Sequence, residues 1–227
     1  MTGIEEAKKA VGKKSAELIQ QEMIVGLGTG STANYFIEHL IDRCKKGLKI
    51  TAVSSSHESL ERARKGGIPV YDINDVSHID ITVDGADEID PQKRMIKGGG
   101  GAHVREKILA SSSNEMVVIV DETKLVDRLG KSKLPVEILF YGSSATKRKL
   151  EKMGYQCKWR INKDGSLFLS DNGNIILDIF FDAPPANPEH EHSKIIHVPG
   201  VVDTGFFFGL AGRVIIGYLN GKVEVIK

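Results

Sequence analysis

The stretch "MIVGLGTGSTANYF", residues 23–36, decides the fold, because a short apolar run ends in a glycine-rich turn that leads directly into a helix. The apolar run is typical of a buried strand. The helix is predicted from apolar residues at i, i+3 and i+4 spacing, with Ser31 or Thr32 placed to cap it. These apolar positions are Ala33, Phe36, Ile37, Leu40, Ile41 and Cys44. A strand, a glycine turn and a helix in this order predict one unit of an α/β sheet.

Strands and helices continue to alternate through the first half of the chain. Helical spacing from Ile4 to Ile19 predicts an amphipathic helix before the first strand. Further strands are predicted in "KITAVSSS", "HIDITVDGADEID" and "EMVVIVDETK", and further helices in "HESLERARKGG" and "AHVREKILASSS". This alternation predicts an α/β fold with a Rossmann-like, mostly parallel sheet wrapped by helices, and ligands at the carboxyl ends of the strands.

The pattern changes after Pro135, where a helix is followed by hairpin signals and a polar, proline-bearing stretch, "DAPPANPEHEHSK". We therefore expect a second, smaller α+β domain at residues 131–206. The α/β domain, which we expect to be the catalytic one, then comprises residues 1–130 and 207–227. Its last segment is predicted to form a hairpin through Asn220 and Gly221.

Composition favours small-molecule chemistry. The 227 residues include 31 Lys or Arg and 30 Asp or Glu, so the formal net charge of +1 gives no field that attracts nucleic acid or a membrane surface. No apolar run approaches the roughly 18 residues of a membrane span, and the charged N-terminus lacks a signal peptide. Cys44 and Cys157 form no CxxC pattern, so we expect reduced thiols in a cytoplasmic protein.

The opening turn fits neither of the common nucleotide motifs. Gly26 and Gly28 match the first two glycines of the dinucleotide pattern, but Ser31 takes the third position and the next strand ends in serines. No Gly-Lys-Ser/Thr follows, which disfavours a triphosphate loop. A helix N-terminus with Thr29, Ser31 and Thr32 hydroxyls suits one phosphate monoester. The alternative is a tight turn with a capping hydroxyl and no ligand.

A second stretch, "VDGADEID", gathers four carboxylates at the end of an apolar strand: Asp84, Asp87, Glu88 and Asp90. Like charges this close repel, so at least one is expected to have a raised pKa or a cationic partner. Acid–base chemistry would use either arrangement. A solvated acidic loop or a divalent-metal site remains an alternative.

A third stretch, "MIKGGGGAHVREKIL", places Lys97 before Gly98–Gly101 and Glu106 in the following helix. Four glycines let the backbone approach a ligand closely. A lysine, a glycine loop and a glutamate together could place a cation and a base around one small sugar. Taken singly, Lys97 could be a surface charge, and Glu106 could pair with a neighbouring base on the helix surface.

Together these stretches resemble the ribose-5-phosphate isomerase A family. "GLGTGSTA", "AVSSS", "VDGADEID", "KGGGGAHVREKI", "LPVE", "DNGN" with "ILD", and "PGVV" occur in the family's order over essentially the whole chain. The resemblance implies interconversion of ribose 5-phosphate and ribulose 5-phosphate in the pentose phosphate pathway. It also implies no metal or organic cofactor and a homodimer or homotetramer.

The resemblance also implies the site residues. Glu106 matches the general base, and Lys97, Asp84 and Asp87 match the other catalytic groups. The substrate-binding residues implied are Lys8, Thr29, Gly30, Ser31, Thr32, Asp84, Gly85, Ala86, Asp87, Lys97, Gly98, Gly99, Gly100 and Lys124. From the chemistry of an enediolate, we expect Glu106 to move the carbon proton and Lys97 to stabilise the oxyanion, while the aspartates serve ring opening and the oxygen-side protons.

One departure from the family pattern is His103, where an apolar residue is usual. Partly exposed packing is expected, with a perturbation of Glu106 on the same helix face as the alternative. The rivals in function are a sugar-phosphate sensor, which would carry a basic DNA-binding module, an amino-sugar phosphate deaminase-isomerase and a coenzyme A transferase. The "HEH" at residues 190–192 is predicted to be a solvated loop segment and not a metal site.

Overall fold

The computed structural model describes residues 3–227, and the chain divides into two compact units. Unit 1 contains Met1–Ala86, Arg105–Leu125 and Leu210–Lys227, and unit 2 contains Asp87–Val104 and Val126–Gly209. Residues 87–104 thus group with unit 2, although the sequence analysis assigned them to the first domain. The domain boundaries at 131 and 206 stay a prediction.

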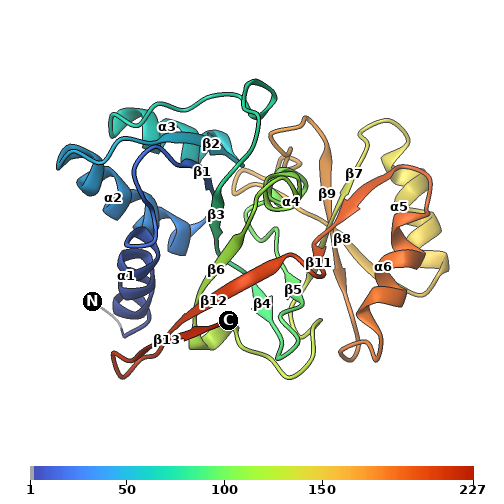
Figure 1. The fold of residues 1–227 in the computed structure, drawn as a ribbon. Helices are drawn as coiled ribbons and strands as arrows, with labels where there is room; N and C mark the ends of the chain where they lie inside the picture. Colours follow the sequence, from blue (N-terminus) through green and yellow to red (C-terminus); the bar gives the residue numbers. More distant parts are fainter. Residues whose placement is uncertain (1–2) are drawn as a thin grey trace. The chain divides into compact units, whose positions relative to one another are not determined.

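Unit 1 is built on a six-stranded sheet in the order β13-β12-β6-β3-β1-β2 (Figure 1). The strands are β1 (Ile24–Leu27), β2 (Thr51–Ser54), β3 (Ile81–Asp84), β6 (Met116–Asp121), β12 (Ala211–Gly217) and β13 (Val223–Ile226). All neighbours pair in parallel except β13, which returns antiparallel to β12 through the predicted hairpin. The predicted mostly parallel α/β fold is confirmed.

Register brings the first two informative stretches to one edge of this sheet. Strand β1 lies between β2 and β3, with Leu27 opposite Val83 on one side and Ser54 on the other. The Gly28 N–H donates to the carbonyl of Val83 at 3.0 Å. The glycine turn after β1 therefore lies beside Asp84, the last residue of β3, at the carboxyl edge expected for ligands.

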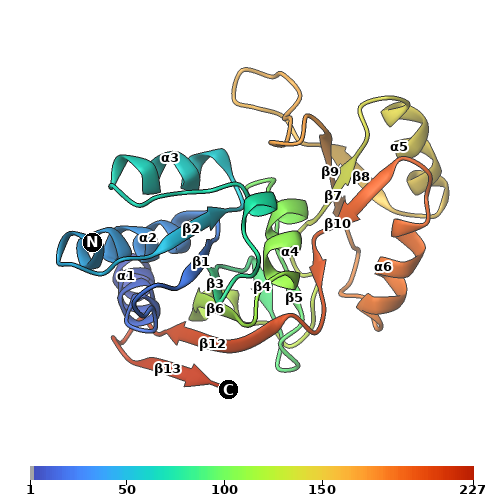
Figure 2. The same ribbon diagram turned by 45° about the horizontal axis from the view of Figure 1, so that its top comes forward.

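Helices cover both faces of the unit 1 sheet. They are α1 (Gly3–Ala16), α2 (Ser31–Lys45), α3 (His57–Lys65) and α4 (His103–Ser111), with the short 3-10 helices η1 (Ile73–Asp75) and η2 (Glu122–Lys124). Helices α1 to α3 share one core with the sheet, and α1 and α2 lie side by side (Figure 2). On the other face Leu109 of α4 packs with Val53 and Ile79. Strands buried on both faces explain why their sequences are continuous apolar runs.

Unit 2 contains an antiparallel sheet in the order β10-β7-β9-β8 and a three-stranded sheet in the order β11-β5-β4. Its elements are β4 (Glu88–Ile89), β5 (Met95–Ile96), β7 (Leu134–Ile138), α5 (Ser143–Lys152), β8 (Gln156–Trp159), β9 (Ile175–Phe180), α6 (Pro188–Ile196), β10 (Val201–Thr204) and β11 (Phe206–Phe207). Leu150 of α5 and Ile195 of α6 pack with Val136, Leu177 and Phe206 in one core, so α5 and α6 cover one face of the four-stranded sheet. This confirms the smaller α+β part of the fold.

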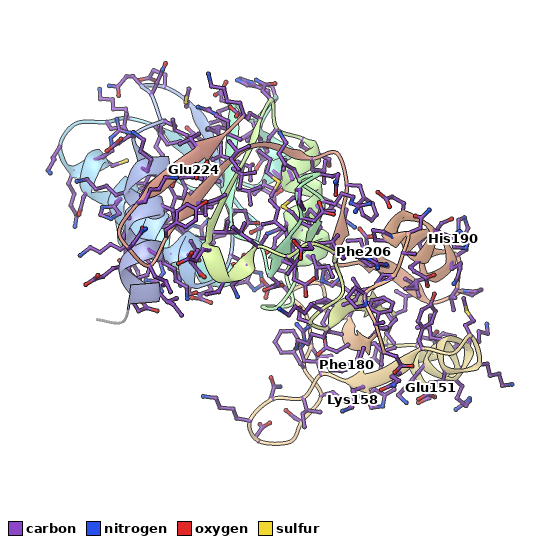
Figure 3. The ribbon with its side chains drawn as sticks, turned by 90° about the horizontal axis from the view of Figure 1, so that it is seen from below. Glu151, Lys158, Phe180, His190, Phe206 and Glu224 are labelled. Atoms are coloured by element: carbon purple, nitrogen blue, oxygen red, sulfur yellow. The ribbon has the colours of Figure 1, made fainter. Side chains whose placement is uncertain are left out.

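The outer strand of that sheet, β8, carries alternately exposed residues. Lys158 Nζ lies 5.1 Å from the centroid of the Phe180 ring on the neighbouring strand, and Figure 3 shows the two side chains together. A lysine on an edge strand discourages pairing with another chain, because its charge would have to be desolvated.

Three local predictions are wrong. Helix α1 ends at Ala16 and not at Ile19, although Ile19 is buried. Helix α2 has Gly30 as its N-cap without a side-chain cap, so neither Ser31 nor Thr32 acts as the cap. The stretch expected to be a polar loop contains α6, whose Asn187 side chain accepts from the His190 N–H and whose first residue is Pro188. Asparagine followed by proline is a helix-start signal that the sequence analysis overlooked.

No helix within residues 3–227 is long and apolar enough to cross a membrane. Cys44 and Cys157 are free thiols. Burial raises the pKa of the Cys157 thiol to about 11, so little of it is a reactive thiolate at neutral pH.

Candidate active site

In unit 1, the opening turn is closed around the carboxylate of Asp84. The N–H groups of Thr29 and Gly85 both donate to Asp84 Oδ1, at 3.0 and 2.7 Å. A Cβ on Gly28 would lie 2.5 Å from the Asp84 Cβ and would overlap its carboxylate. Asp84 is 1% exposed. Glycine is therefore required at position 28 for close packing, and two backbone amides fix the orientation of the Asp84 carboxylate.

One serine hydroxyl from the "AVSSS" stretch, that of Ser55, and one from α3, that of Ser59, support the same turn. Ser55 Oγ lies 2.8 Å from Thr29 Oγ1 and donates to the carbonyl of Leu27 at 3.0 Å. Ser59 Oγ donates to the carbonyl of Gly28 at 2.6 Å. In the sequence, Ser55 served only as evidence against NAD and Ser59 was not singled out, whereas in the structure both hydroxyls hold the turn in place.

The start of α2 is arranged for an anion. Gly30 has a φ of 98°, a conformation that favours glycine, and because it has no side chain it cannot cap the first N–H groups of the helix. Lys8 Nζ, on α1, donates to Ser31 Oγ at 3.1 Å. N–H groups without a side-chain cap at a helix N-terminus favour an anion, and the neighbouring lysine adds a positive charge.

Two other predicted residues of unit 1 lie on neighbouring elements. Glu106 is on α4 and only 4% exposed, so it is not the helix-surface residue of the alternative interpretation. Lys124 ends η2, the turn after β6, and is partly buried. Asp121 precedes this turn, accepts the Thr123 N–H at 3.0 Å, and so fixes the start of the segment that carries Lys124.

The four crowded carboxylates separate to different partners. Asp84 accepts the two amides above, and Asp87 Oδ2 accepts the Gly99 N–H at 2.7 Å. Glu88 is buried and accepts N–H groups from residues 130–132. Asp90 accepts from Arg94 Nε at 2.7 Å. The predicted cationic partner is therefore present at Asp90, and the alternative of one solvated acidic loop is wrong.

In unit 2, the glycine loop holds Lys97 and Asp87. The Lys97 N–H donates to the carbonyl of Gly205 at 2.9 Å, and Lys97 is 3% exposed, with Nζ 5.5 Å from the centroid of the Phe207 ring. Lys97 is thus not a surface charge. A Cβ on Gly99 would lie 2.6 Å from Asp87 Oδ1, so the glycine permits the close approach of this carboxylate.

His103 is fully buried, which corrects the expectation of partly exposed packing. A Cβ on Gly98, whose φ is 98°, would lie 2.7 Å from His103 Nδ1. His103 Nε2 lies 3.4 Å from the carbonyl oxygen of Asp203. The ring therefore packs against the glycine loop and explains one of its glycines.

The histidines of "HEH" lie in α6 and not in a loop. His192 Nδ1 lies 2.8 Å from Thr204 Oγ1, while Glu191 accepts from Lys194 Nζ at 2.8 Å and His190 is exposed. Among residues 3–227 there is no group of three or more His, Cys, Asp or Glu side chains that could hold a metal ion.

Comparisons with known proteins agree with these motifs. A sequence model of the family described as ribose 5-phosphate isomerase A (phosphoriboisomerase A) matches residues 51–221. The chain is 53% identical to the ribose-5-phosphate isomerase A of Protochlamydia amoebophila over 220 residues, covering 97% of this chain and 95% of that protein. It is 45% identical to that of Listeria innocua over 97% of this chain and 98% of that protein.

Solved structures are similar over the whole chain. The ribose 5-phosphate isomerase of Plasmodium falciparum superposes with a TM-score of 0.94 at 38% identity, covering 98% of both chains. A D-ribose-5-phosphate isomerase in complex with phospho-erythronic acid superposes with a TM-score of 0.93 at 35% identity, covering 99% of both chains.

Proposed function

Since the chain belongs to the ribose 5-phosphate isomerase A family, which interconverts ribose 5-phosphate and ribulose 5-phosphate, we propose that it does so through an enediolate with Glu106 as the base. The observation that carries this assignment is the burial of the glutamate in "REK", which is 4% exposed although it lies in a helix between Arg105 and Lys107. One carboxylate can take the proton from C2 and return it to C1, because the two carbons are adjacent.

Burial of Glu106 supports its role as a base. The Glu106 side chain is only 4% exposed, so little bulk water surrounds its carboxylate. General-base catalysis of this kind contributes about 10²–10⁴-fold to rate. Glu106 is the group that moves the carbon-bound proton.

The oxygen-side work falls to the remaining catalytic residues. As the oxyanion develops, the ammonium of Lys97 stabilises it, and its low exposure makes that charge more effective than in water. Asp84 and Asp87 serve the ring opening and the protons on O1 and O2. Their contacts differ, because one oxygen of Asp84 accepts hydrogen bonds from two backbone N–H groups, whereas Asp87 accepts a hydrogen bond from the Gly99 N–H. Asp84 is therefore the more firmly oriented of the two.

The phosphate is bound by the first turn of α2 together with Lys8 and Lys124. The lack of a side-chain cap on α2 and the contact of Lys8 with Ser31 support this placement. Binding energy from a phosphate remote from the reacting carbons positions them for proton transfer. Ribose without the phosphate is expected to react slowly.

Phospho-erythronic acid, the compound in one of the similar structures, is a useful probe for this chain. Its carboxylate has two oxygens on one carbon and resembles the oxygens of an enediolate, while its phosphate resembles that of the substrate. It is expected to compete with ribose 5-phosphate and to bind this chain more tightly than the substrate does.

We also propose that the working form is a homodimer or homotetramer that acts without a metal or organic cofactor, as the family resemblance implies, and that it is cytoplasmic, as the composition and cysteines predict. Activity is expected to persist in a chelator. The sensor, the deaminase-isomerase and the coenzyme A transferase are less consistent with the "DGADE" and "KGGGG…REK" motifs.

The test is the rate of ribulose 5-phosphate formation by wild type, Glu106→Gln and Glu38→Gln, all checked for equal thermal stability. Glu38 is a matched control, because it is a helix glutamate that contacts Arg62 at the surface. The expected result is a loss of about 10³-fold in kcat for Glu106→Gln, a small change in KM and no change for Glu38→Gln. Activity near wild type in Glu106→Gln would remove glutamate from the base role.

A further inference from the structure

Arg160 follows strand β8 and is 8% exposed. Its backbone is fixed on both sides: its N–H donates to the carbonyl of Ile176 at 3.0 Å, and its carbonyl accepts the Phe168 N–H at 3.0 Å. A long cationic side chain in a buried and fixed position has few conformations available. Its contacts therefore indicate what it does.

The guanidinium is oriented by Asp178, a residue of β9 that is 5% exposed. Arg160 Nε donates to Asp178 Oδ2 at 3.1 Å, and Nη2 donates to Oδ1. Lys133 Nζ also donates to Asp178 Oδ2, at 2.8 Å. A two-point contact between guanidinium and carboxylate fixes the plane of the guanidinium. Two cations on one carboxylate leave a net positive charge.

That charge meets the backbone of the glycine loop. Arg160 Nη1 donates to the carbonyl of Gly98 at 2.8 Å and to that of Gly99 at 3.1 Å. The Gly98 carbonyl and the Gly99 N–H belong to one peptide group, and this N–H donates to Asp87 Oδ2. A continuous set of hydrogen bonds therefore runs from Asp178 through Arg160 and one peptide group to Asp87, and each bond polarises the next.

Stability alone does not explain an arginine here. A buried ion pair can often be replaced by apolar residues of similar volume without loss of stability, because desolvation offsets the attraction. An apolar residue would leave two loop carbonyls without this donor. The surroundings also fit the planar group: the Phe168 ring lies 5.7 Å from the guanidinium carbon, and a Cβ on Gly101 would overlap that ring.

We propose that Arg160, anchored by Asp178, is a positioning residue for the isomerase reaction. It fixes the Gly98–Gly99 peptide and thereby orients the Asp87 carboxylate and the backbone that follows Lys97. The proposal rests on the catalytic roles proposed for Asp87 and Lys97. Without the guanidinium the loop keeps its covalent path but samples other conformations, so kcat falls while phosphate binding by Lys8 and α2 is retained.

The experiment compares wild type with Arg160→Met, Arg160→Lys and Arg128→Met. Arg128 is the matched control, because it is an exposed arginine of unit 2 whose Nη2 also donates to a backbone carbonyl, that of Pro184, at 2.9 Å. The expected result for Arg160→Met is a loss of about 100-fold in kcat with KM changed by less than about threefold. Arg160→Lys keeps the positive charge but lacks the planar guanidinium that donates to several acceptors, so this variant is expected to recover only part of kcat. Arg128→Met is expected to match wild type.

A second arm separates positioning from folding. Arg160→Ala leaves space for a small cation, so millimolar guanidinium is expected to restore about tenfold in kcat to this variant and none to Asp87→Asn. Faster hydrogen exchange of the Gly99 amide in Arg160→Met, at unchanged melting temperature, is the readout that needs no substrate. Wild-type kcat and Gly99 protection in Arg160→Met would overturn the proposal, whereas an inactive wild type would overturn the proposed function instead.

Discussion

Two glycine turns in this protein solve the same problem with different means. In unit 1 the turn after β1 gives the Thr29 N–H to Asp84, and in unit 2 the loop after β5 gives the Gly99 N–H to Asp87. At each turn one glycine leaves room for the carboxylate that the turn binds. Glycine is thus required to bring backbone amides within hydrogen-bond distance of a carboxylate.

The turns differ in what supports them. The neutral hydroxyls of Ser55 and Ser59 donate to backbone carbonyls of the first turn, while the charged guanidinium of Arg160 donates to a carbonyl of the second. The first carboxylate is almost fully buried with two amide donors, and the second is partly exposed with one. A turn supported by hydroxyls and close packing should be sensitive to added volume, and one supported by charge should be sensitive to loss of that charge.

The largest effect is expected from adding one methyl group at each turn. In Gly28→Ala the new Cβ overlaps a buried carboxylate that cannot move, so we expect a loss of about 3 kcal/mol in stability and of at least about 100-fold in kcat. In Gly99→Ala the new Cβ meets the carboxylate of Asp87, which is the end of a partly exposed side chain. We therefore expect smaller losses, of about 1 kcal/mol in stability and about tenfold in kcat. Thermal unfolding and steady-state kinetics measure both.

Equal losses in the two variants would break the comparison, because they would mean that the buried and the exposed carboxylate yield equally to a methyl group. A stable Gly28→Ala protein with normal kinetics would show that Asp84 has room to move.

A smaller effect is expected from Gly30→Ala, with Gly47→Ala as its control. Both glycines have positive φ, 98° and 106°, and a Cβ on either meets nothing within 4 Å. Each variant should therefore lose about 1–2 kcal/mol of stability from backbone strain alone. Only Gly30 lies at the start of α2, so only Gly30→Ala is expected to raise KM for ribose 5-phosphate. An unchanged KM would remove this turn from phosphate binding.

The smallest effect is expected at the ion pair between Arg213 and Glu115, which lies outside both glycine turns. Arg213 donates to both carboxylate oxygens of Glu115 at 2.6 Å, and this hydrogen bonding holds the pKa of Glu115 below its usual value. Because the pKa of Glu115 is lower in the folded state than in the unfolded state, the pair stabilises the fold at pH values above the unfolded-state pKa. This stabilisation is lost as the pH falls through the folded-state pKa. Arg213→Met should therefore cost about 0.5–1 kcal/mol at pH 7 and less below about pH 4, with kcat unchanged.

Denaturant unfolding at several pH values checks this prediction, and the same protein serves as a baseline for Arg160→Met. A kcat loss in Arg213→Met as large as that in Arg160→Met would mean that loss of any arginine–carboxylate pair lowers activity, and Arg160 would then have no specific role at the second turn.

Much of the fold could be predicted from local patterns. The parallel sheet followed from apolar runs between helices, and the final hairpin from Asn220 and Gly221. Helix α6 was missed because the three prolines and the charged side chains of residues 182–194 suggested a loop, although Asn187 and Pro188 signal a helix start. The predicted cap of α2 was wrong because the prediction used side-chain type alone, and the sequence does not give the backbone angles of Gly30.

The candidate site could be predicted only in part. The glycines and carboxylates of the site lie in short sequence stretches, so their chemistry can be predicted from the sequence. Arg160 lies about 60 residues after the loop that it contacts, and only the pairing of β8 with β9, which places Asp178 opposite Lys158, brings this anchor near Arg160. For His103, packing against Gly98 decided its burial, which no local pattern reports.

The measurement that tests the central claim most directly is proton NMR of ribose 5-phosphate in deuterated buffer with a chelator, for wild type and Glu106→Gln. Proton transfer through an enediolate predicts that wild type forms ribulose 5-phosphate, with solvent deuterium at C1 in the molecules whose abstracted proton exchanges before it returns, and that Glu106→Gln loses exchange and conversion together. Conversion and exchange at the wild-type rate in Glu106→Gln would contradict the central claim that Glu106 is the base.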